Sequence, residues 1–214
     1  MNRSFLSNTC RCSGPNWFFK ITLPALLIAL VFAEPVAAQA TYSVDPKASK
    51  VEWTGRKVTG QHNGSIQVKA GSLKWGMDGL THGEVVIDMT SITNQDLDPE
   101  EASMLVGHLK SKDFFDVGTY KEASFVSTAV EKITAEAGKA NYRLTGNLTI
   151  KGITKPVVFT VLARQAERGV RATGTMSFNR TLYGIKYRSG SFFDALGDRM
   201  IEDMIELSFD LHAR

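Results

Sequence analysis

Apolar and polar residues alternate with a period of two along most of the chain after residue 60. The clearest run contains Val170, Ala172, Gly174, Met176 and Phe178, which alternate with Arg171, Thr173, Thr175 and Ser177. Successive side chains of a β-strand point to opposite faces, so this run predicts a strand with one dry face. Similar runs contain Ile66, Val68 and Ala70; Val85, Ile87 and Met89; Leu144, Leu148 and Ile150; Val157, Phe159 and Val161; and Ile205, Leu207, Phe209 and Leu211.

The spacing of these runs predicts an all-β antiparallel fold. Turn residues separate the runs, as in Asn63-Gly64 and Lys151-Gly152, which indicates a meander. Up-and-down order and few prolines favour the closure of about eight strands into a barrel, because closure removes exposed edges. An eight-stranded barrel either fills itself with side chains or holds one small ligand. Periodicity alone leaves both possibilities open.

One segment breaks the alternation and predicts a single amphipathic helix over residues 99–110. Asp98 suits the N-cap, Pro99 the first turn and Glu101 a capping box. Apolar residues then follow at helical spacing, namely Ala102, Leu105, Val106 and Leu109. Phe114 and Phe115 come directly after this helix, and we expect them to hold it against the β-structure.

Residues 1–40 have the composition of a signal peptide. Three basic residues precede an apolar run from Ile21 to Phe32, and Ala38-Gln39-Ala40 supplies the small residues that a signal peptidase reads. Twelve apolar residues span about 18 Å as a helix, short of the roughly 30 Å hydrocarbon core, so cleavage after Ala40 is favoured over a permanent membrane span. We therefore expect a periplasmic or secreted protein with one domain over residues 41–214.

Cleavage would remove both cysteines, Cys10 and Cys12, and thereby exclude disulfides and thiolate chemistry from the mature chain. It would also remove three of the 25 basic and one of the 22 acidic residues. The balance that remains is nearly neutral and gives no reason to expect nucleic acid as a partner.

The sequence contains no recognisable catalytic or metal-binding signature. There is no G-x-S-x-G, no phosphate-binding Gly-Lys-Ser/Thr loop and no H-E-x-x-H. His62 and His82 would meet only across strands and lack further ligands, while His108 is expected to cap or bridge the end of the helix. Asp113 and Asp116 suit turns better than acid–base work.

Four segments resemble the YceI-like family when they are taken together in this order. They are HLKSKDFFDVGTYKEASF from His108, GNLTIKGITKPVVF from Gly146, NRTLYGIKY from Asn179 and GSFFDALGD from Gly190. The resemblance covers Thr41 to Arg214 and implies a lipocalin-like exported barrel that holds a long isoprenoid or related lipid in its cavity. A Gly-rich opening from Trp53 to Gly64, and Lys121 where a proline is common, indicate a divergent subgroup.

Aromatic residues and one basic cluster are the candidate ligand contacts. A ligand-holding barrel is lined by aromatic and apolar side chains, and the segment Asn179–Arg188 is predicted to form part of the cavity mouth. Arg180 or Arg188 would hold a phosphate head group, or the tyrosines a quinone; alternatively, these cations form a solvated face. The candidate residues are Phe114, Phe115, Phe125, Phe159, Phe178, Tyr183, Tyr187, Phe192, Phe193, Arg180 and Arg188.

The sequence thus predicts a lipid-binding protein without enzymatic activity, for transport, storage or stress protection. A polyisoprenoid or an isoprenoid quinone is the expected ligand, no other cofactor or metal is implied, and a homodimer is a possible further assembly. Two alternatives remain open: a filled barrel that serves a structural role or a protein partner, and an enzyme that acts on a small apolar substrate.

Overall fold

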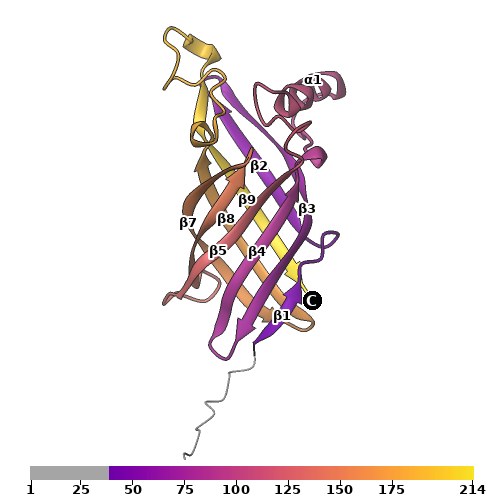
Figure 1. Cartoon of the computed structure of the whole chain (residues 1–214), viewed down its shortest axis with the longest axis vertical. Helices are drawn as coiled ribbons and strands as arrows, with labels where there is room; N and C mark the ends of the chain where they lie inside the picture. Colours follow the sequence, from indigo (N-terminus) through magenta and orange to yellow (C-terminus); the bar gives the residue numbers. More distant parts are fainter. Residues whose placement is uncertain (1–38) are drawn as a thin grey trace, which may run out of the picture. The chain divides into compact units, whose positions relative to one another are not determined.

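The structure is a computed structural model that describes residues 39–214. The predicted signal peptide lies, apart from its last two residues, outside the described residues. The described chain forms a closed antiparallel β-barrel with one α-helix, which confirms the predicted fold class (Figure 1). Its strands are β1 (Ala40–Ser43), β2 (Lys50–Lys57), β3 (Gly60–Gly76), β4 (Gly79–Asp88), β5 (Glu122–Lys132), β6 (Tyr142–Ile150), β7 (Ile153–Ala166), β8 (Gly169–Asn179) and β9 (Ile201–Ala213).

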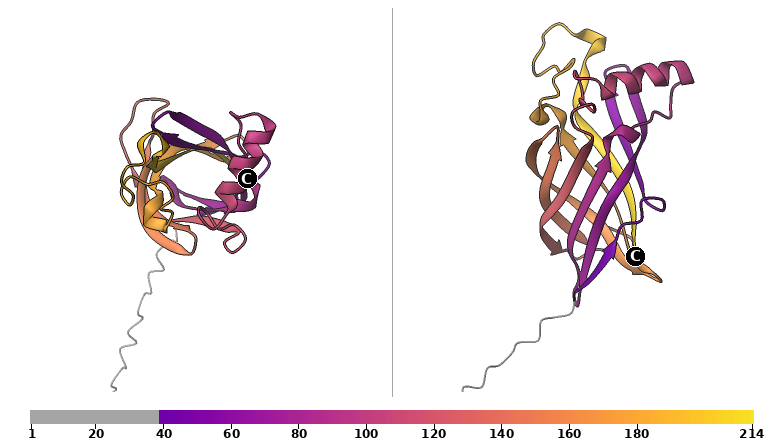
Figure 2. Two further views of the ribbon diagram at one scale, coloured as in Figure 1. Left: turned by 90° about the horizontal axis from the view of Figure 1, so that it is seen from above. Right: turned by 45° about the vertical axis from the view of Figure 1, so that its right-hand side comes forward.

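The nine strand elements occupy eight positions around the barrel. Each strand from β3 to β9 pairs with the next, and β2 closes the ring by pairing with both β3 and β9. The short β1 pairs with the other end of β3, from Ser72 to Trp75. β1 and β2 therefore lie beside the same edge of β3 and share one position in the ring. Figure 2 shows the ring from above. Closure leaves no long unpaired edge among these strands, as the meander predicts.

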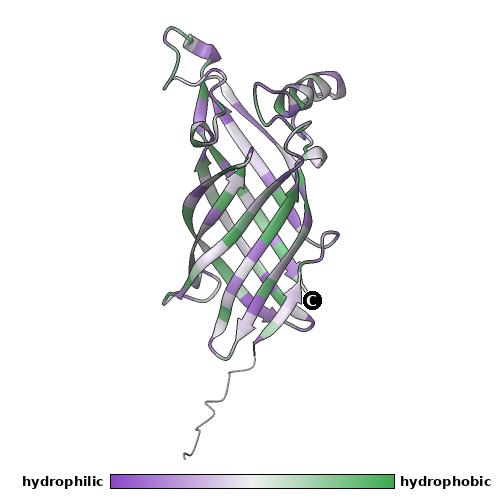
Figure 3. Ribbon diagram, in the orientation of Figure 1, coloured by the Kyte–Doolittle hydropathy of each residue, from purple (hydrophilic) through white to green (hydrophobic). Residues whose placement is uncertain are grey.

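Side chains alternate between the barrel interior and its outer surface. Figure 3 shows apolar and polar residues alternating along the strands, and Val170, Ala172, Met176 and Phe178 are all buried as predicted. The prediction for Ala70 is wrong, because the register between β3 and β4 shifts between Val68 and Ala70 and leaves Ala70 exposed. Such a bulge adds one residue to a strand and reverses the faces beyond it.

One of the two predicted turns is confirmed and the other is wrong. Lys151 and Gly152 join β6 to β7 with φ of 50° and 70°, a two-residue hairpin that needs left-handed backbone at both positions. Asn63 and Gly64 instead lie inside β3. A Cβ at Gly64 would clash with the Thr93 carbonyl, so glycine here allows a close backbone approach rather than a turn.

The helix α1 spans Pro99–Lys110, the predicted range. The Asp98 carboxylate accepts hydrogen bonds from the backbone N–H groups of Glu100 and Glu101, both at 3.0 Å, which satisfies two free donors of the first turn. A short 3-10 helix, η1 (Met89–Ser91), precedes it. No helix among residues 39–214 is long and apolar enough to cross a membrane.

Residues 180–200, which we call the rim segment, connect β8 to β9. The segment contains two 3-10 helices, η2 (Arg180–Tyr183) and η3 (Gly197–Arg199). It lies at the same end of the barrel as α1 (Figures 1 and 2). The helix α1 lies in the connection from β4 to β5, and the rim segment lies in the connection from β8 to β9. These two connections therefore mark one end of the barrel, and the residues around them position the candidate site.

Candidate functional site: an apolar cavity in the barrel

The barrel encloses a cavity of about 230 Å³. Strands β2 to β9, the helix α1 and the segment that follows it all contribute to its lining, which is almost entirely aliphatic and aromatic. The volume lies somewhat below the range of about 300–1,000 Å³ that is usual for ligand-binding pockets. The aromatic residues of the lining are Trp53, Phe114, Phe115, Phe125, Phe159, Phe178 and Phe209.

Buried side chains close the cavity at the end remote from α1. The lining there consists of Leu73, Leu80, Val161, Ala172 and Leu211, all 7% exposed or less. Beyond them, the rings of Trp75 and Tyr142 pack edge to face with centroids 6.2 Å apart. The Tyr142 hydroxyl also accepts a hydrogen bond from the Leu80 N–H at 3.3 Å. This end of the barrel is therefore packed shut.

The opposite end is more open and more polar. Six of the lining residues at this end are half-buried, and we call this group the mouth: Arg56, Lys57, His62, Leu105, His108 and Ile201. Of the two cations, Arg56 lies 3.8 Å from Glu206 with its side chain 41% exposed, so that ion pair is screened by solvent. An apolar molecule therefore has one route into the cavity that the described residues leave partly open.

Three phenylalanines form a band between the two ends. Phe125 and Phe159 pack edge to face with centroids 5.1 Å apart, and Phe159 packs on Phe209 at 5.9 Å. All three line the cavity and are only partly buried. Aromatic pairs favour this edge-to-face geometry, so the three rings form one continuous apolar surface inside the barrel.

Five of the predicted site residues line the cavity: Phe114, Phe115, Phe125, Phe159 and Phe178. Phe114 is 4% exposed, whereas Phe115 is half-buried. The two rings pack edge to face with centroids 5.1 Å apart, between the end of α1 and the cavity. Their position agrees with the expected lining role, and contact with a ligand stays a prediction.

Arg180 has a different role from the one predicted. It is completely buried but absent from the cavity lining. All five of its N–H donors are used at 2.9–3.3 Å, by the carbonyl oxygens of Ile185, Tyr187, Ile201 and Glu202 and by the Asp203 carboxylate. No donor is left for a phosphate, and a solvated position is equally wrong. Arg180 instead ties both ends of the rim segment together.

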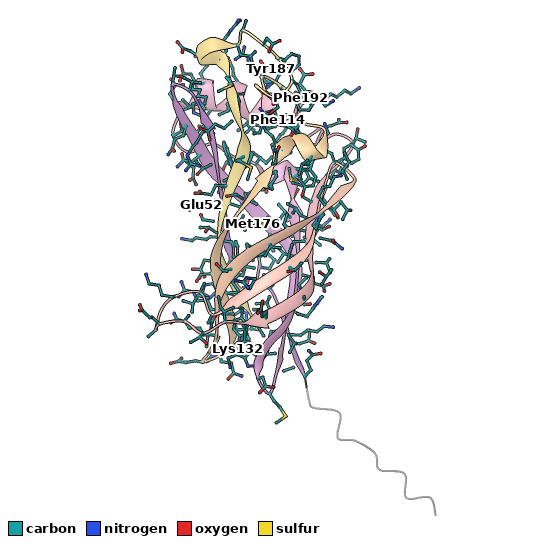
Figure 4. The ribbon with its side chains drawn as sticks, turned by 90° about the vertical axis from the view of Figure 1, so that its left-hand side faces the viewer. Glu52, Phe114, Lys132, Met176, Tyr187 and Phe192 are labelled. Atoms are coloured by element: carbon teal, nitrogen blue, oxygen red, sulfur yellow. The ribbon has the colours of Figure 1, made fainter. Side chains whose placement is uncertain are left out.

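Five further candidate residues lie in the rim segment and outside the cavity lining. Tyr183 is buried, and desolvation raises the pKa of its phenol. Tyr187 packs against His108, and the exposed Arg188 lies 5.1 Å above the Tyr187 ring. Phe192 and Phe193 are 47% and 51% exposed, so these two candidate contacts lie on the surface and not in the cavity. Figure 4 shows Tyr187, Phe192 and Phe114 near the same end of the barrel.

The histidines do not form a metal site. His62 Nδ1 lies 2.8 Å from the Asp96 carboxylate, and His82 Nδ1 lies 3.0 Å from the Ser127 hydroxyl. Burial would raise the pKa of Asp96, but hydrogen bonds from the Asn63 N–H and from His62 outweigh it and lower that pKa. Residues 39–214 contain no group of three side chains suited to hold a metal ion.

Sequence reasoning missed several lining residues. Trp53 and Phe209 were indistinguishable from ordinary core aromatics. Lys57 and His108 were missed because only the fold brings the β2 end and the last turn of α1 to one opening. His108 follows Leu105 by about one helical turn and so lies on the apolar side of the helix. This spacing is the single feature of the sequence that indicates an inward position for His108.

The fold and the cavity define a lipocalin-like antiparallel barrel with an apolar interior. The chain belongs to the YceI-like domain family, which residues 42–213 match. A UPF0312 protein of Pseudomonas savastanoi pv. phaseolicola is 42% identical over 85 residues, which are 37% of this chain and 42% of that protein. This alignment thus spans less than half the length of the relative.

Solved structures share the barrel. BcnA of Burkholderia cenocepacia is 26% identical, with a TM-score of 0.59 over 78% of this chain and 98% of BcnA. A polyisoprenoid binding domain from Saccharophagus degradans is 16% identical, with a TM-score of 0.54 over 79% of this chain and 95% of that domain. The second likeness concerns the fold alone.

Proposed function

We propose that this protein binds a long apolar lipid, a polyisoprenoid or an isoprenoid quinone, in the barrel cavity. The observation that carries the proposal is the apolar cavity, shut at one end and partly open at the other. A structural neighbour described as a polyisoprenoid binding domain supports it. Because the cavity is small for such a lipid, we expect part of a long chain to extend through the mouth.

Binding rather than catalysis is proposed because the titratable residues of the lining, as far as the structure describes them, all lie at the mouth, namely Arg56, Lys57, His62 and His108. The enclosed part of the cavity is lined almost entirely by apolar side chains. Transport, storage or protection of the lipid needs only the cavity.

Lipid extraction tests the proposal. Mature protein purified from its native host is extracted with organic solvent, and mass spectrometry is expected to find a stoichiometric isoprenoid. The variant Met176→Trp fills the cavity, since Met176 lines it and is 8% exposed. Val158→Trp is the matched control on the outer surface, where Val158 is 61% exposed. Lipid is expected to fall several-fold in the first variant and to stay unchanged in the second.

Failure of the wild-type protein to carry or take up any lipid would favour the alternative of a filled barrel that serves a partner.

We also propose that the protein is exported and cleaved after Ala40, because basic residues precede an apolar run and small residues follow it. Amino-terminal sequencing of protein from the cell envelope is expected to begin at Thr41. A full-length cytoplasmic product would contradict export without affecting the cavity.

A further inference from the structure

The side chain of His108 brings an unpaired polar atom to the cavity. His108 lies in the last turn of α1 and lines the cavity at the mouth. Its Nε2 atom is buried and has no hydrogen-bond partner among the described residues. Ser111 donates two hydrogen bonds to the His108 backbone carbonyl, from its N–H at 3.0 Å and from its hydroxyl at 2.8 Å. The expected capping role therefore belongs to the backbone of this residue and not to the imidazole.

Aromatic rings hold the imidazole in place. The His108 ring lies 4.3 Å from the Tyr187 ring and 5.9 Å from the Phe114 ring, centroid to centroid. Arg180 lies behind Phe114, with its guanidinium carbon 5.7 Å from the ring centroid. Since Arg180 also fixes the rim segment that carries Tyr187, the imidazole sits in a preorganised frame.

An unpaired buried nitrogen calls for an explanation. Removing a polar atom from water without giving it a partner is unfavourable, and most buried polar atoms in proteins are paired. The rings around His108 offer packing but no strong hydrogen-bond partner. His108 lines the cavity, and no described residue, including the other polar residues of the mouth, pairs with this atom, so a molecule in the cavity is the partner that would.

We propose that His108 Nε2 is the polar anchor of the ligand and makes one hydrogen bond to a neutral oxygen at its head, a hydroxyl or a carbonyl. A neutral imidazole offers one donor and one acceptor nitrogen, so either oxygen is suited to it. The inference rests on the proposed function and specifies its ligand. It disfavours a diphosphate head group, because all five N–H donors of Arg180 are used and the half-buried Arg56 already lies beside Glu206.

Binding measurements with four probes that share one tetraprenyl tail test this anchor. The probes are geranylgeraniol, a menaquinone with that side chain, geranylgeranyl diphosphate and the tetraprenyl hydrocarbon. Delipidated protein is titrated and the fluorescence of the cavity residue Trp53 is followed. The alcohol or the quinone is expected to bind about 5- to 15-fold more tightly than the hydrocarbon, as one hydrogen bond allows. Which of the two binds more tightly identifies the natural head group.

Three variants assign the preference to a side chain. His108→Phe keeps the ring shape, and it is expected to reduce the preference over the hydrocarbon to within about 2-fold. His108→Gln restores an amide near the Nε2 position and is expected to recover most of the preference. Lys186→Met, at an exposed residue of the rim segment outside the cavity lining, is the control and is expected to leave the preference intact. Without ligand, His108→Phe is expected to unfold at the same or a higher urea concentration, because an unpaired polar atom is removed.

The possible failures are distinguishable. Persistence of the full head-group preference in folded His108→Phe would overturn the anchor, while binding of the hydrocarbon by all variants would leave the proposed function standing. Tighter binding of the diphosphate than of the alcohol, lost in Lys57→Met, would also overturn it. Failure of every probe to bind the wild-type protein would reject both proposals.

Discussion

Replacement of Arg180 by methionine is expected to destabilise the barrel strongly, even though Arg180 touches no part of the cavity. The variant removes five hydrogen bonds, four of them to backbone carbonyls, and strips Asp203 of its ion-pair partner. The Asp203 side chain is 17% exposed. Removing one partner of a buried ion pair costs about 3–5 kcal/mol, and we expect a loss of free energy of unfolding in this range.

Urea denaturation, followed by tryptophan fluorescence and far-ultraviolet circular dichroism, measures this loss. With a denaturant slope of about 2 kcal/mol/M, the midpoint is expected to fall by roughly 1.5–2.5 M. Arg180→Lys keeps the charge but offers three donors in place of five, and we expect an intermediate midpoint. Lys186→Met is the control, because Lys186 is exposed in the same segment and only stacks on Phe192 at 4.6 Å.

A loss below about 1 kcal/mol, compared with the usual effect of an exposed substitution, would refute the structural role. If Arg180→Met remained as stable as Lys186→Met and selectively lost a charged lipid, Arg180 would instead bind a head group, as the sequence first indicated.

Three further predictions concern the barrel itself. In denaturant melts, Phe114→Ala is expected to cost about 3–5 kcal/mol and Phe115→Ala clearly less, because only the first ring is fully buried. Gly146→Ala is expected to cost about 1–3 kcal/mol, since its Cβ would lie 2.6 Å from the Val126 carbonyl oxygen; full stability would show that the strand relaxes. Hydrogen bonds from Arg171 lower the pKa of Asp210, so this stabilisation is present above the ordinary pKa of about 3.9 and is lost as pH falls through the lowered value. Asp210→Asn is therefore expected to be less stable than wild type at neutral pH and equal to it in strong acid; an equal gap at both pH values would exclude the ion pair as the cause.

Much of the fold was predictable because local signals and tertiary structure agree. Alternation identified the strands, and the Asp98-Pro99 start identified α1 to the residue. The bulge near Ala70 was not predictable. An extra residue shifts the alternation of apolar and polar residues by one position, and this shift cannot be recognised where the residues on both faces of the strand are small or polar. The Asn63-Gly64 pair misled because glycine also serves close backbone contacts.

The site was harder to predict, because its polar residues are far apart in the sequence and come together only in the folded chain. Nothing in the sequence distinguishes Arg180 from an exposed arginine. In the folded chain β9 lies beside η2, and its first residues supply carbonyl groups that accept hydrogen bonds from the buried guanidinium group. Phe192 and Phe193 repeat the pattern of Phe114 and Phe115, yet only the first pair lies against the cavity. Aromatic pairs indicate a chain reversal, whereas the surrounding strands decide which pair faces inward.

The packed end of the barrel also has a kinetic consequence. Because Leu80, Ala172 and their neighbours close that end, a lipid bound as we propose, with its head at the mouth, would enter tail first and leave head first, and a second chain would not pass it inside. Exchange then proceeds through an empty barrel. The rate at which a new lipid replaces a bound one is thus set by the departure of the first, and at saturation it does not depend on how much of the second is supplied.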